Sequence, residues 1–133
     1  MIKNGVDIIS ISRVQKALER SGDAFWNRVC SDAERSIVPS HETRKIEFLA
    51  GRFAAKEAVS KALGTGIGGK GVSMTDMEIL KKENGAPYVR LSGQAREEYE
   101  RCGGRSISVS ISHDADMAVA FCCIECEGAE EES

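Results

Sequence analysis

A glutamate and a lysine spaced by one helical turn are the first candidates for chemistry in this sequence. Glu57 and Lys61 lie four residues apart, so on a helix their side chains share a face. Such a pair is often an ordinary surface ion pair that contributes only about 0.3–0.5 kcal/mol. Two features favour a functional interpretation. Phe53 and Leu63 place the stretch at the boundary of a core, and the helix runs straight into a glycine-rich segment.

That segment holds five glycines between positions 64 and 71 and begins Gly64-Thr65-Gly66. Without Cβ atoms, its backbone N–H groups can approach a phosphate closely. It is not a Walker loop, because Val72 stands where that motif requires lysine. It also follows a helix, so no helix N-terminus is available to hold the anion. We predict a flexible loop, and a role in covering a phosphate stays open because glycine-rich loops are not specific to that role.

A carboxylate inside an apolar strand is the second candidate. Asp7 lies within Gly-Val-Asp-Ile-Ile, and burying it unpaired is costly. It therefore requires a cation, hydrogen bonds or a place on the exposed face of the strand. If Asp7 and Glu57 converge, the two carboxylates suit Mg²⁺, which takes one or two protein carboxylates together with substrate phosphates and water.

His113 ends a strongly alternating segment, 106–112, and precedes an acidic turn. Two interpretations stay open: a solvated histidine in a turn, or a phosphate or nucleotide contact at the end of a strand. The spacing specifies no nucleophile elbow, so a Ser-His-Asp triad is not indicated.

The five cysteines do not predict a disulfide framework, because their number is odd and the N-terminus lacks the long apolar stretch of a signal peptide. A C-x-x-C pair occurs at Cys123 and Cys126, but no second pair or suitably spaced histidine accompanies it. Small apolar strand residues are therefore the favoured interpretation, and a zinc or redox role is the alternative.

The elements that must position these residues follow from periodicity and capping signals. We predict helices at 13–20 with Ser12 as the cap, from Asp23, after the capping box Ser31–Glu34, at 42–63, and at 93–102. Strands are predicted at 5–11, 73–82, through 87–91, at 106–112 and at 117–124, with turns at Asn84-Gly85 and Asp114-Ala115. The order does not alternate βαβα. It predicts one compact α+β domain over 1–124, with the long helix packed on a small, mainly antiparallel sheet, and a disordered acidic tail over 125–133.

Composition limits the function classes. The chain has 133 residues and a formal net charge of −3. No apolar run of membrane-spanning length occurs, and no dense Lys/Arg cluster indicates nucleic-acid binding, so we expect a cytoplasmic protein without either partner. Residues 1–124 carry 18 basic and 16 acidic side chains, while 125–133 carry five glutamates. Arg13, Lys16 and Arg20 share one face of the helix at 13–20; a docking face for an acidic partner and an ordinary solvated face both stay open.

Several of these segments occur together in a known order. They are Gly5-Val-Asp7-Ile, Ile11-Ser-Arg13-Val, the run from Phe48 to Gly68, Asn84-Gly-Ala-Pro87, Leu91-Ser-Gly and Val109-Ser-Ile-Ser-His113. With them the sequence resembles the holo-acyl-carrier-protein synthase family, the small bacterial 4′-phosphopantetheinyl transferases. The resemblance covers residues 2–124. The start Lys3-Asn4-Gly5 departs from the Gly-Ile-Gly usual in that family.

The resemblance implies a reaction in fatty acid biosynthesis. Coenzyme A donates its 4′-phosphopantetheine group to a serine hydroxyl of apo-acyl carrier protein, and adenosine 3′,5′-bisphosphate leaves. The resemblance further implies Mg²⁺ and a homotrimer with active sites between subunits. A non-catalytic module that binds a nucleotide or coenzyme A is the alternative.

The resemblance also implies residue roles. Asp7 and Glu57 match metal-binding carboxylates, and Glu57 is also the candidate to orient or deprotonate the serine. Lys61 would neutralise the transferring phosphate. The remaining matches are Gly64, Thr65 and Gly66 near the diphosphate, Arg52 and His113 near the nucleotide and its 3′-phosphate, Asn84 and Pro87 at the adenine, and Arg13, Lys16 and Arg20 at the carrier protein. Asn84-Gly85 is equally explained as turn chemistry.

Overall fold

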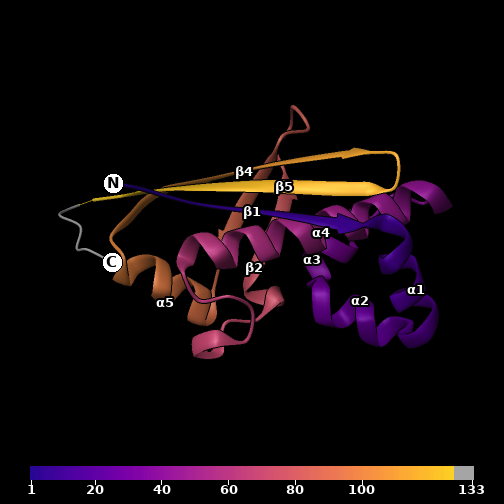
Figure 1. The fold of residues 1–133 in the computed structure, drawn as a ribbon, viewed down its shortest axis with the longest axis horizontal. Helices are drawn as coiled ribbons and strands as arrows, with labels where there is room; N and C mark the ends of the chain where they lie inside the picture. The colour runs from indigo at the N-terminus through magenta and orange to yellow at the C-terminus, as the bar shows by residue number, and fades with distance from the viewer. Residues whose placement is uncertain (128–133) are drawn as a thin grey trace.

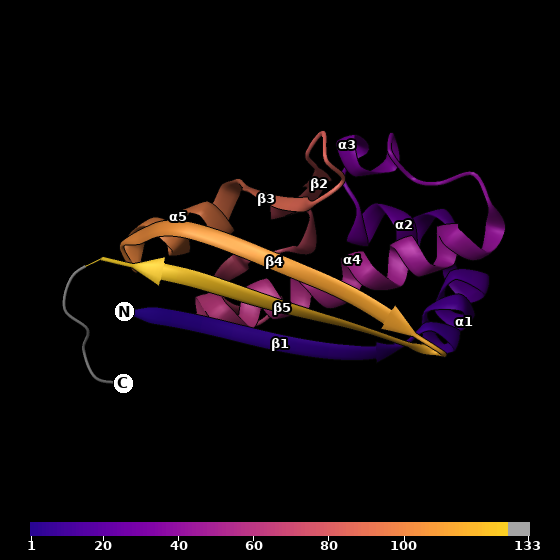
Figure 2. The ribbon, with the colours of Figure 1, turned by 90° about the horizontal axis from the view of Figure 1, so that it is seen from above.

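The computed structural model describes residues 1–127 and has a long helix lying across a three-stranded sheet (Figures 1 and 2). The sheet is antiparallel in the order β1-β5-β4, formed by β1 (Ile2–Ser10), β5 (Met117–Cys126) and β4 (Gly104–Asp114). Alternation along β5 sends every second side chain toward the helix, so Ala118, Ala120, Cys122, Ile124 and Cys126 are buried. The predicted α+β arrangement is confirmed.

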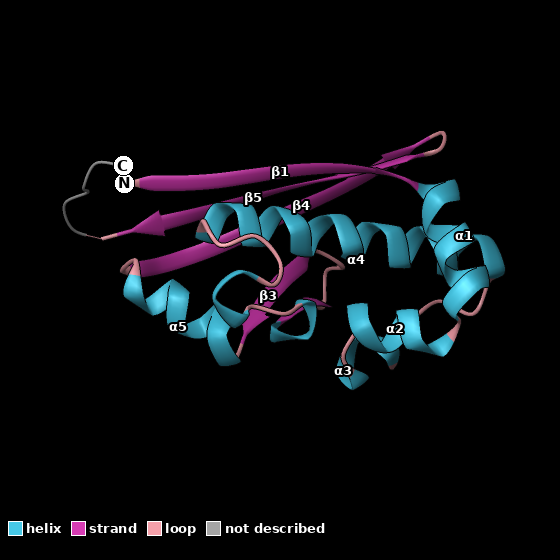
Figure 3. Cartoon of the chain, turned by 60° about the horizontal axis from the view of Figure 1, so that its bottom comes forward, coloured by secondary structure: helices cyan, strands magenta, loops and turns pink. Residues whose placement is uncertain are grey.

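The long helix α4 (Glu42–Leu63) begins and ends where the sequence predicted. Its many alanines favour a helix and allow close packing. Gly64 ends it with a φ of +87°, a left-handed conformation that glycine adopts without strain. Buried side chains occur on most sides of α4, because the sheet covers one side and other elements cover the rest (Figure 3).

Three short helices cover one end of α4: α1 (Ile11–Ser21), α2 (Asp23–Val29) and α3 (Asp32–Arg35). Ser31 and Glu34 form the predicted capping box of α3. The prediction that Ser12 caps the first helix is wrong, because Ser10 is the N-cap and its hydroxyl accepts from the Arg13 N–H. Ser12 instead donates its N–H and its hydroxyl to the Asp116 carboxylate in the β4–β5 turn.

A second, two-stranded sheet packs beside α4 and against the edge strand β4, and consists of β2 (Met77–Lys81) and β3 (Pro87–Leu91) (Figure 2). The predicted strand 73–82 is shorter than expected, because a capping box between Ser73 and Asp76 forms a 3₁₀ turn, η2 (Met74–Asp76). The glycine-rich segment contains a similar turn, η1 (Gly69–Gly71). Helix α5 (Gly93–Arg101) follows β3.

The end of β5 differs from the expected domain boundary at residue 124. The strand continues through Cys126, and Glu125 pairs with Ile2 and Ser106, so these residues belong to the folded sheet. The rest of the predicted tail, 128–133, lies outside the described residues. Within residues 1–127, no helix has both the length and the apolar character that a membrane span requires.

Candidate functional site

Asp7 and Lys61 meet where β1 crosses α4. The Lys61 Nζ lies 3.1 Å from Asp7 Oδ1 and also donates to the Val6 carbonyl oxygen at 3.0 Å. The Asp7 side chain is 19% exposed and that of Lys61 52% exposed. Asp7 is therefore on the inward face of its strand, paired with a cation, and not on the exposed face.

A backbone contact at Gly5, two residues before Asp7, brings Asp7 and Lys61 together. A Cβ atom on Gly5 would lie 2.8 Å from the Ala62 nitrogen and closer still to the Ala58 carbonyl oxygen. Only glycine lets β1 approach α4 this closely. Asp7 faces the same way as Gly5 along the strand, so it meets the last turns of the helix.

Glu57 lies one turn before Lys61 on α4 and is half-buried. Burial raises the pKa of its carboxyl group, the charge of Asp7 raises that pKa further, and Lys61 partly offsets the rise. Two carboxylates that repel one another in a partly buried place are stabilised by a cation. Within residues 1–127, no group of three or more His, Cys, Asp or Glu side chains is placed to hold a metal ion. The protein donors offered here are two carboxylates. This donor set fits Mg²⁺.

Asp7 and Glu57 line a cavity of about 740 Å³ together with one face of α1. That face presents the predicted cations Arg13, Lys16 and Arg20 to the same cavity. The structure thus joins the predicted docking face and the predicted carboxylates in one site.

Sequence reasoning missed two other parts of this cavity. Arg28 on α2 adds a fourth cation, and its guanidinium lies 5.2 Å from the centre of the Phe25 ring. Phe25 stacks on Phe53 and supplies an apolar wall. The positive charge of Arg28 was visible in the sequence, but its position depends on how α2 turns back against α1.

A second cavity, of about 470 Å³, lies between α4, β4 and the β2–β3 turn and contains three of the four residues predicted at the nucleotide. Arg52, Pro87 and His113 all line it. Asn84 is not among its lining residues. The Asn84 side chain accepts from the Ala86 N–H within the turn, as the turn interpretation predicts.

Arg52 is held firmly in this cavity. Its Nε and one terminal nitrogen donate to the Ile79 carbonyl oxygen at 3.2 and 3.0 Å, and the guanidinium lies 4.0 Å from the centre of the Phe48 ring. Burial lowers the pKa of this guanidinium. The His113 Nδ1 lies 4.0 Å from a carboxylate oxygen of Glu47.

We expected the backbone N–H groups of the glycine-rich segment to be free to bind a phosphate, and the structure differs. The N–H groups of Gly64, Thr65 and Gly66 all donate to the Ser60 carbonyl oxygen, at 3.0–3.1 Å. They close the C-terminus of α4, whose last carbonyls lack partners within the helix. The Thr65 hydroxyl donates to the Gly66 carbonyl oxygen. In this structure the three backbone donors are therefore occupied.

The two cavities have no lining residue in common. Arg52 and Glu57 are five residues apart on α4, which separates them by about 140° around the helix axis. The predicted metal-binding and nucleotide-binding residues of one chain therefore face different directions.

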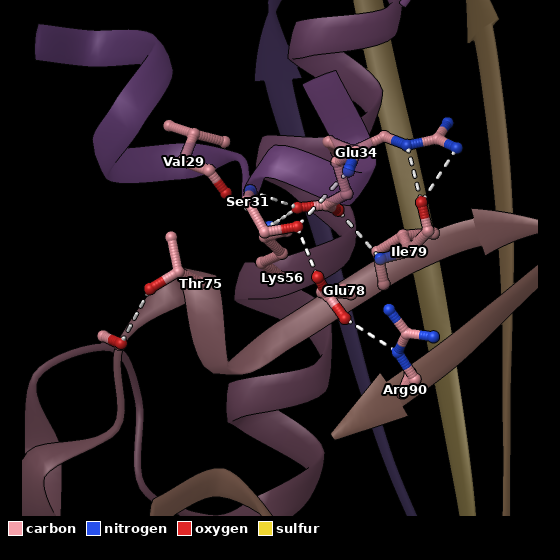
Figure 4. A network of polar contacts seen from close by, with 10 residues as sticks. Val29, Ser31, Glu34, Lys56, Thr75, Glu78, Ile79 and Arg90 are labelled. Carbon is pink, nitrogen blue, oxygen red and sulfur yellow. Dashed lines mark hydrogen bonds and ion pairs between the residues drawn. The ribbon is translucent and has the colours of Figure 1, made fainter. Parts of the chain in front are cut away.

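A buried ion pair fixes α4 between the cavities (Figure 4). Glu34 and Lys56 are fully buried, with Lys56 Nζ 2.6 Å from Glu34 Oε1. Lys56 also donates to the Val29 carbonyl oxygen. The other oxygen of Glu34 accepts from the Ile79 N–H at 2.8 Å, so α2, α3, α4 and β2 are tied together next to Glu57.

A family model matches nearly the whole chain. Residues 4–122 match the sequence profile of the family described as ACPS, 4′-phosphopantetheinyl transferase superfamily.

The chain belongs to the 4′-phosphopantetheinyl transferase superfamily.

Relatives in this superfamily match over nearly their whole length. A holo-[acyl-carrier-protein] synthase from Ruminiclostridium cellulolyticum is 48% identical over 120 residues, which cover 90% of this chain and 89% of the relative. The crystal structure of the Neisseria meningitidis holo-[acyl-carrier-protein] synthase has a TM-score of 0.85 and 34% identity, covering 94% of this chain and 99% of that one. The Helicobacter pylori synthase in complex with coenzyme A has a TM-score of 0.80 and 38% identity, with 94% and 100% coverage.

Proposed function

We propose that this protein is a holo-acyl-carrier-protein synthase that transfers the 4′-phosphopantetheine group of coenzyme A to a serine hydroxyl of apo-acyl carrier protein. One observation carries the proposal: in a chain of this superfamily, Asp7 and Glu57 share a cavity with the cationic face of α1, and Lys61 pairs with Asp7. A site of this kind suits a polyphosphate substrate and an acidic protein partner. The same activity is named for the relatives described above.

The transfer is a displacement at phosphorus. The serine oxygen forms a bond to the phosphorus that carries the pantetheine arm, and the bond from that phosphorus to the oxygen of the leaving adenosine 3′,5′-bisphosphate breaks. The raised pKa of Glu57 suits a group that accepts the serine proton, directly or through water. Lys61 supplies a positive charge for the transferring phosphate.

We propose that Asp7 and Glu57 hold Mg²⁺. When bound, the ion would supply positive charge to the diphosphate oxygens. The repulsion between the two carboxylates supports this assignment, because it raises the pKa of Glu57 and a cation between them would remove that cost.

The cationic face of α1 is the proposed docking surface for the carrier protein. Arg13, Lys16 and Arg20 are exposed and lie at the mouth of the cavity that holds Glu57. We expect Arg13→Glu to raise the KM for carrier protein about tenfold and to leave the KM for coenzyme A unchanged, because charge reversal acts on protein encounter. Steady-state kinetics with each substrate varied in turn measure this. An equal rise in both KM values would contradict the assignment.

We also propose that the protein works as a homotrimer in which each active site combines the carboxylate cavity of one subunit with the nucleotide cavity of another. Support comes from the direction of the two cavities around α4 and from the uncovered face of the sheet. On that face Ile2, Val6, Ile8 and Phe121 are 46–60% exposed, and Val6 and Phe121 are neighbours in the β1–β5 register. An apolar surface of this kind is typical of an interface between copies.

Intact-mass spectrometry of carrier proteins tests the proposed reaction. Incubation with coenzyme A and Mg²⁺ should convert apo-carrier protein to a species heavier by one phosphopantetheine. A carrier protein whose acceptor serine is replaced by alanine should show no gain, and Glu57→Gln enzyme should be at least ~100-fold slower. Binding of coenzyme A without any mass gain, across a panel of carrier proteins, would favour a non-catalytic binding module.

A further inference from the structure

Two cysteine thiols lie in contact at the end of the sheet farthest from α1. Cys102 is the residue that ends α5, and Cys126 is the last residue of β5. Their sulfur atoms are 3.5 Å apart. Cys102 is half-buried and Cys126 is 3% exposed. Neither thiol has a role in the proposed transfer reaction.

The backbone around the two thiols is held in place. The Glu127 N–H donates to the Gly103 carbonyl oxygen at 2.8 Å, and Gly104 pairs with Cys126 in the β4–β5 ladder. The segments that carry the two cysteines are therefore already adjacent. The two sulfur atoms must approach by roughly 1.5 Å more to reach a disulfide bond length, and side-chain rotation can provide this.

The other three cysteines are poorly placed to bond with Cys102 or Cys126. Cys123 points to the opposite face of β5, and Cys122 lies four residues, roughly 13 Å, along the strand from Cys126. Cys30 belongs to the separate cluster of α1 and α2. Burial raises the pKa of both the Cys30 and Cys122 thiols to about 12, which makes them unreactive. The sequence motif Cys123-x-x-Cys126 is therefore not the pair that the fold brings together.

We propose that Cys102 and Cys126 form an intramolecular disulfide when the protein meets a low-molecular-weight disulfide such as oxidised glutathione. The more exposed Cys102 attacks first as its thiolate, forms a mixed disulfide and releases one reduced glutathione. The Cys126 sulfur then attacks Cys102 Sγ and releases the second glutathione. Two thiols are oxidised, one external disulfide is reduced, and the two thiol protons end on the two glutathione molecules.

The bond would fasten the end of α5 to the end of β5. Helix α5 in turn contacts the glycine-rich segment, where the Gln94 side chain donates to the Lys70 carbonyl oxygen and Lys70 lies 4.0 Å from Glu98. Oxidation therefore anchors an element that supports this segment. We expect the main effect to be stabilisation, because the bond restricts the unfolded chain over residues 102–126.

The test is oxidation of the purified full chain with excess oxidised glutathione at mildly alkaline pH, which offsets the raised pKa of Cys102. The thiol count in denaturant should fall from five to three, and the intact mass should fall by two hydrogens. Trypsin releases Cys102 in the short peptide 102–105. Further cleavage after Glu125 separates Cys126 from Cys122 and Cys123, so the linked peptide identifies the partner. The melting temperature should rise by roughly 5–10 °C and return on reduction.

Cys123→Ser is the matched control. It should form the Cys102–Cys126 bond and show the same rise in melting temperature as the parent chain. Cys102→Ser and Cys126→Ser should both lose the intramolecular bond and the rise in melting temperature. Linkage of peptide 102–105 to Cys122 or Cys123 would overturn the proposal. So would retention of all five thiols, or bonds formed only between chains.

Discussion

At Glu57, burial and a neighbouring carboxylate act in the same direction. Both raise the pKa of its carboxyl group above the ordinary value of 4.5. The folded protein therefore binds this proton more tightly than the unfolded chain. Stability gained from that proton is fully present below pH 4.5 and is lost as pH rises through the folded pKa. The ionised Glu57 that the proposed reaction requires thus costs stability at neutral pH.

We expect Glu57→Gln to raise the melting temperature at neutral pH in the absence of metal, because the amide removes the repulsion from Asp7. The difference should shrink toward zero below pH 4.5, where both forms are uncharged. Mg²⁺ should raise the melting temperature of the parent chain and have little effect on the variant. Thermal unfolding over a pH series checks this. A variant that is less stable than the parent at every pH would contradict the account.

The buried Lys56 beside Glu57 has a structural task, because its ammonium group compensates the buried charge of Glu34. Lys56→Met should lower the free energy of unfolding by about 3–5 kcal/mol, since it leaves an unpaired carboxylate in the core. The double variant Glu34→Gln/Lys56→Met should recover at least ~1 kcal/mol, because the amide oxygen can still accept from Ile79. Urea unfolding measures both values. No recovery in the double variant would show that packing, and not charge, dominates there.

At the scale of helices and strands, the candidate site depends on the contact between β1 and α4. Gly5→Ala would place a methyl group against the backbone of Ala58 and Ala62. We expect a loss of about 2–4 kcal/mol in unfolding free energy and at least a tenfold loss of activity, because the strand that carries Asp7 must move. Gly51→Ala is the control.

An added Cβ at Gly51 would meet only a side-chain methyl of Ile111 at 3.0 Å, while alanine also favours the helix. Its effect on unfolding free energy should lie within about 1 kcal/mol. Equal effects of the two substitutions, measured by urea unfolding, would contradict the importance of the β1–α4 contact.

Local signals in the sequence were sufficient to predict most helices and strands, but not which of their residues come into contact in the fold. The bounds of α4 follow from its composition and Gly64, and the α3 cap follows from Ser31 and Glu34 alone. The cap at Ser10 was missed because Asp116, which engages Ser12, is distant in sequence. Asp7 could equally have faced solvent. Its direction depends on the approach of Gly5 to α4, which no local pattern encodes.

At the scale of the whole molecule, we propose that different subunits supply the two cavities that serve one reaction. Arg44 lines the second cavity together with His113. We expect the Glu57→Gln enzyme and the double variant Arg44→Glu/His113→Ala each to be strongly impaired alone, because each damages one cavity. When equal amounts are refolded together, random assembly should restore roughly a quarter of the sites. Transfer activity, followed by intact mass, reports the restoration.

Phe121→Lys in both partners is the control for assembly. A charge in the middle of the exposed apolar face should prevent association, and sedimentation should then show single chains. Without association, mixing the two variants should no longer restore activity. Full activity of a single-chain species would contradict the shared site.

Both backbone polar groups of Ile79 are bonded: its N–H donates to Glu34 and its carbonyl oxygen accepts from Arg52. Arg52 and Lys56 lie one turn apart on α4, so these bonds fix how the helix is rotated about its own axis. The helix then holds the two cavities of one chain at a fixed angle to each other. If different subunits complete each site, as we propose, activity depends on concentration: diluted below the level at which its copies associate, the protein should lose specific activity without unfolding.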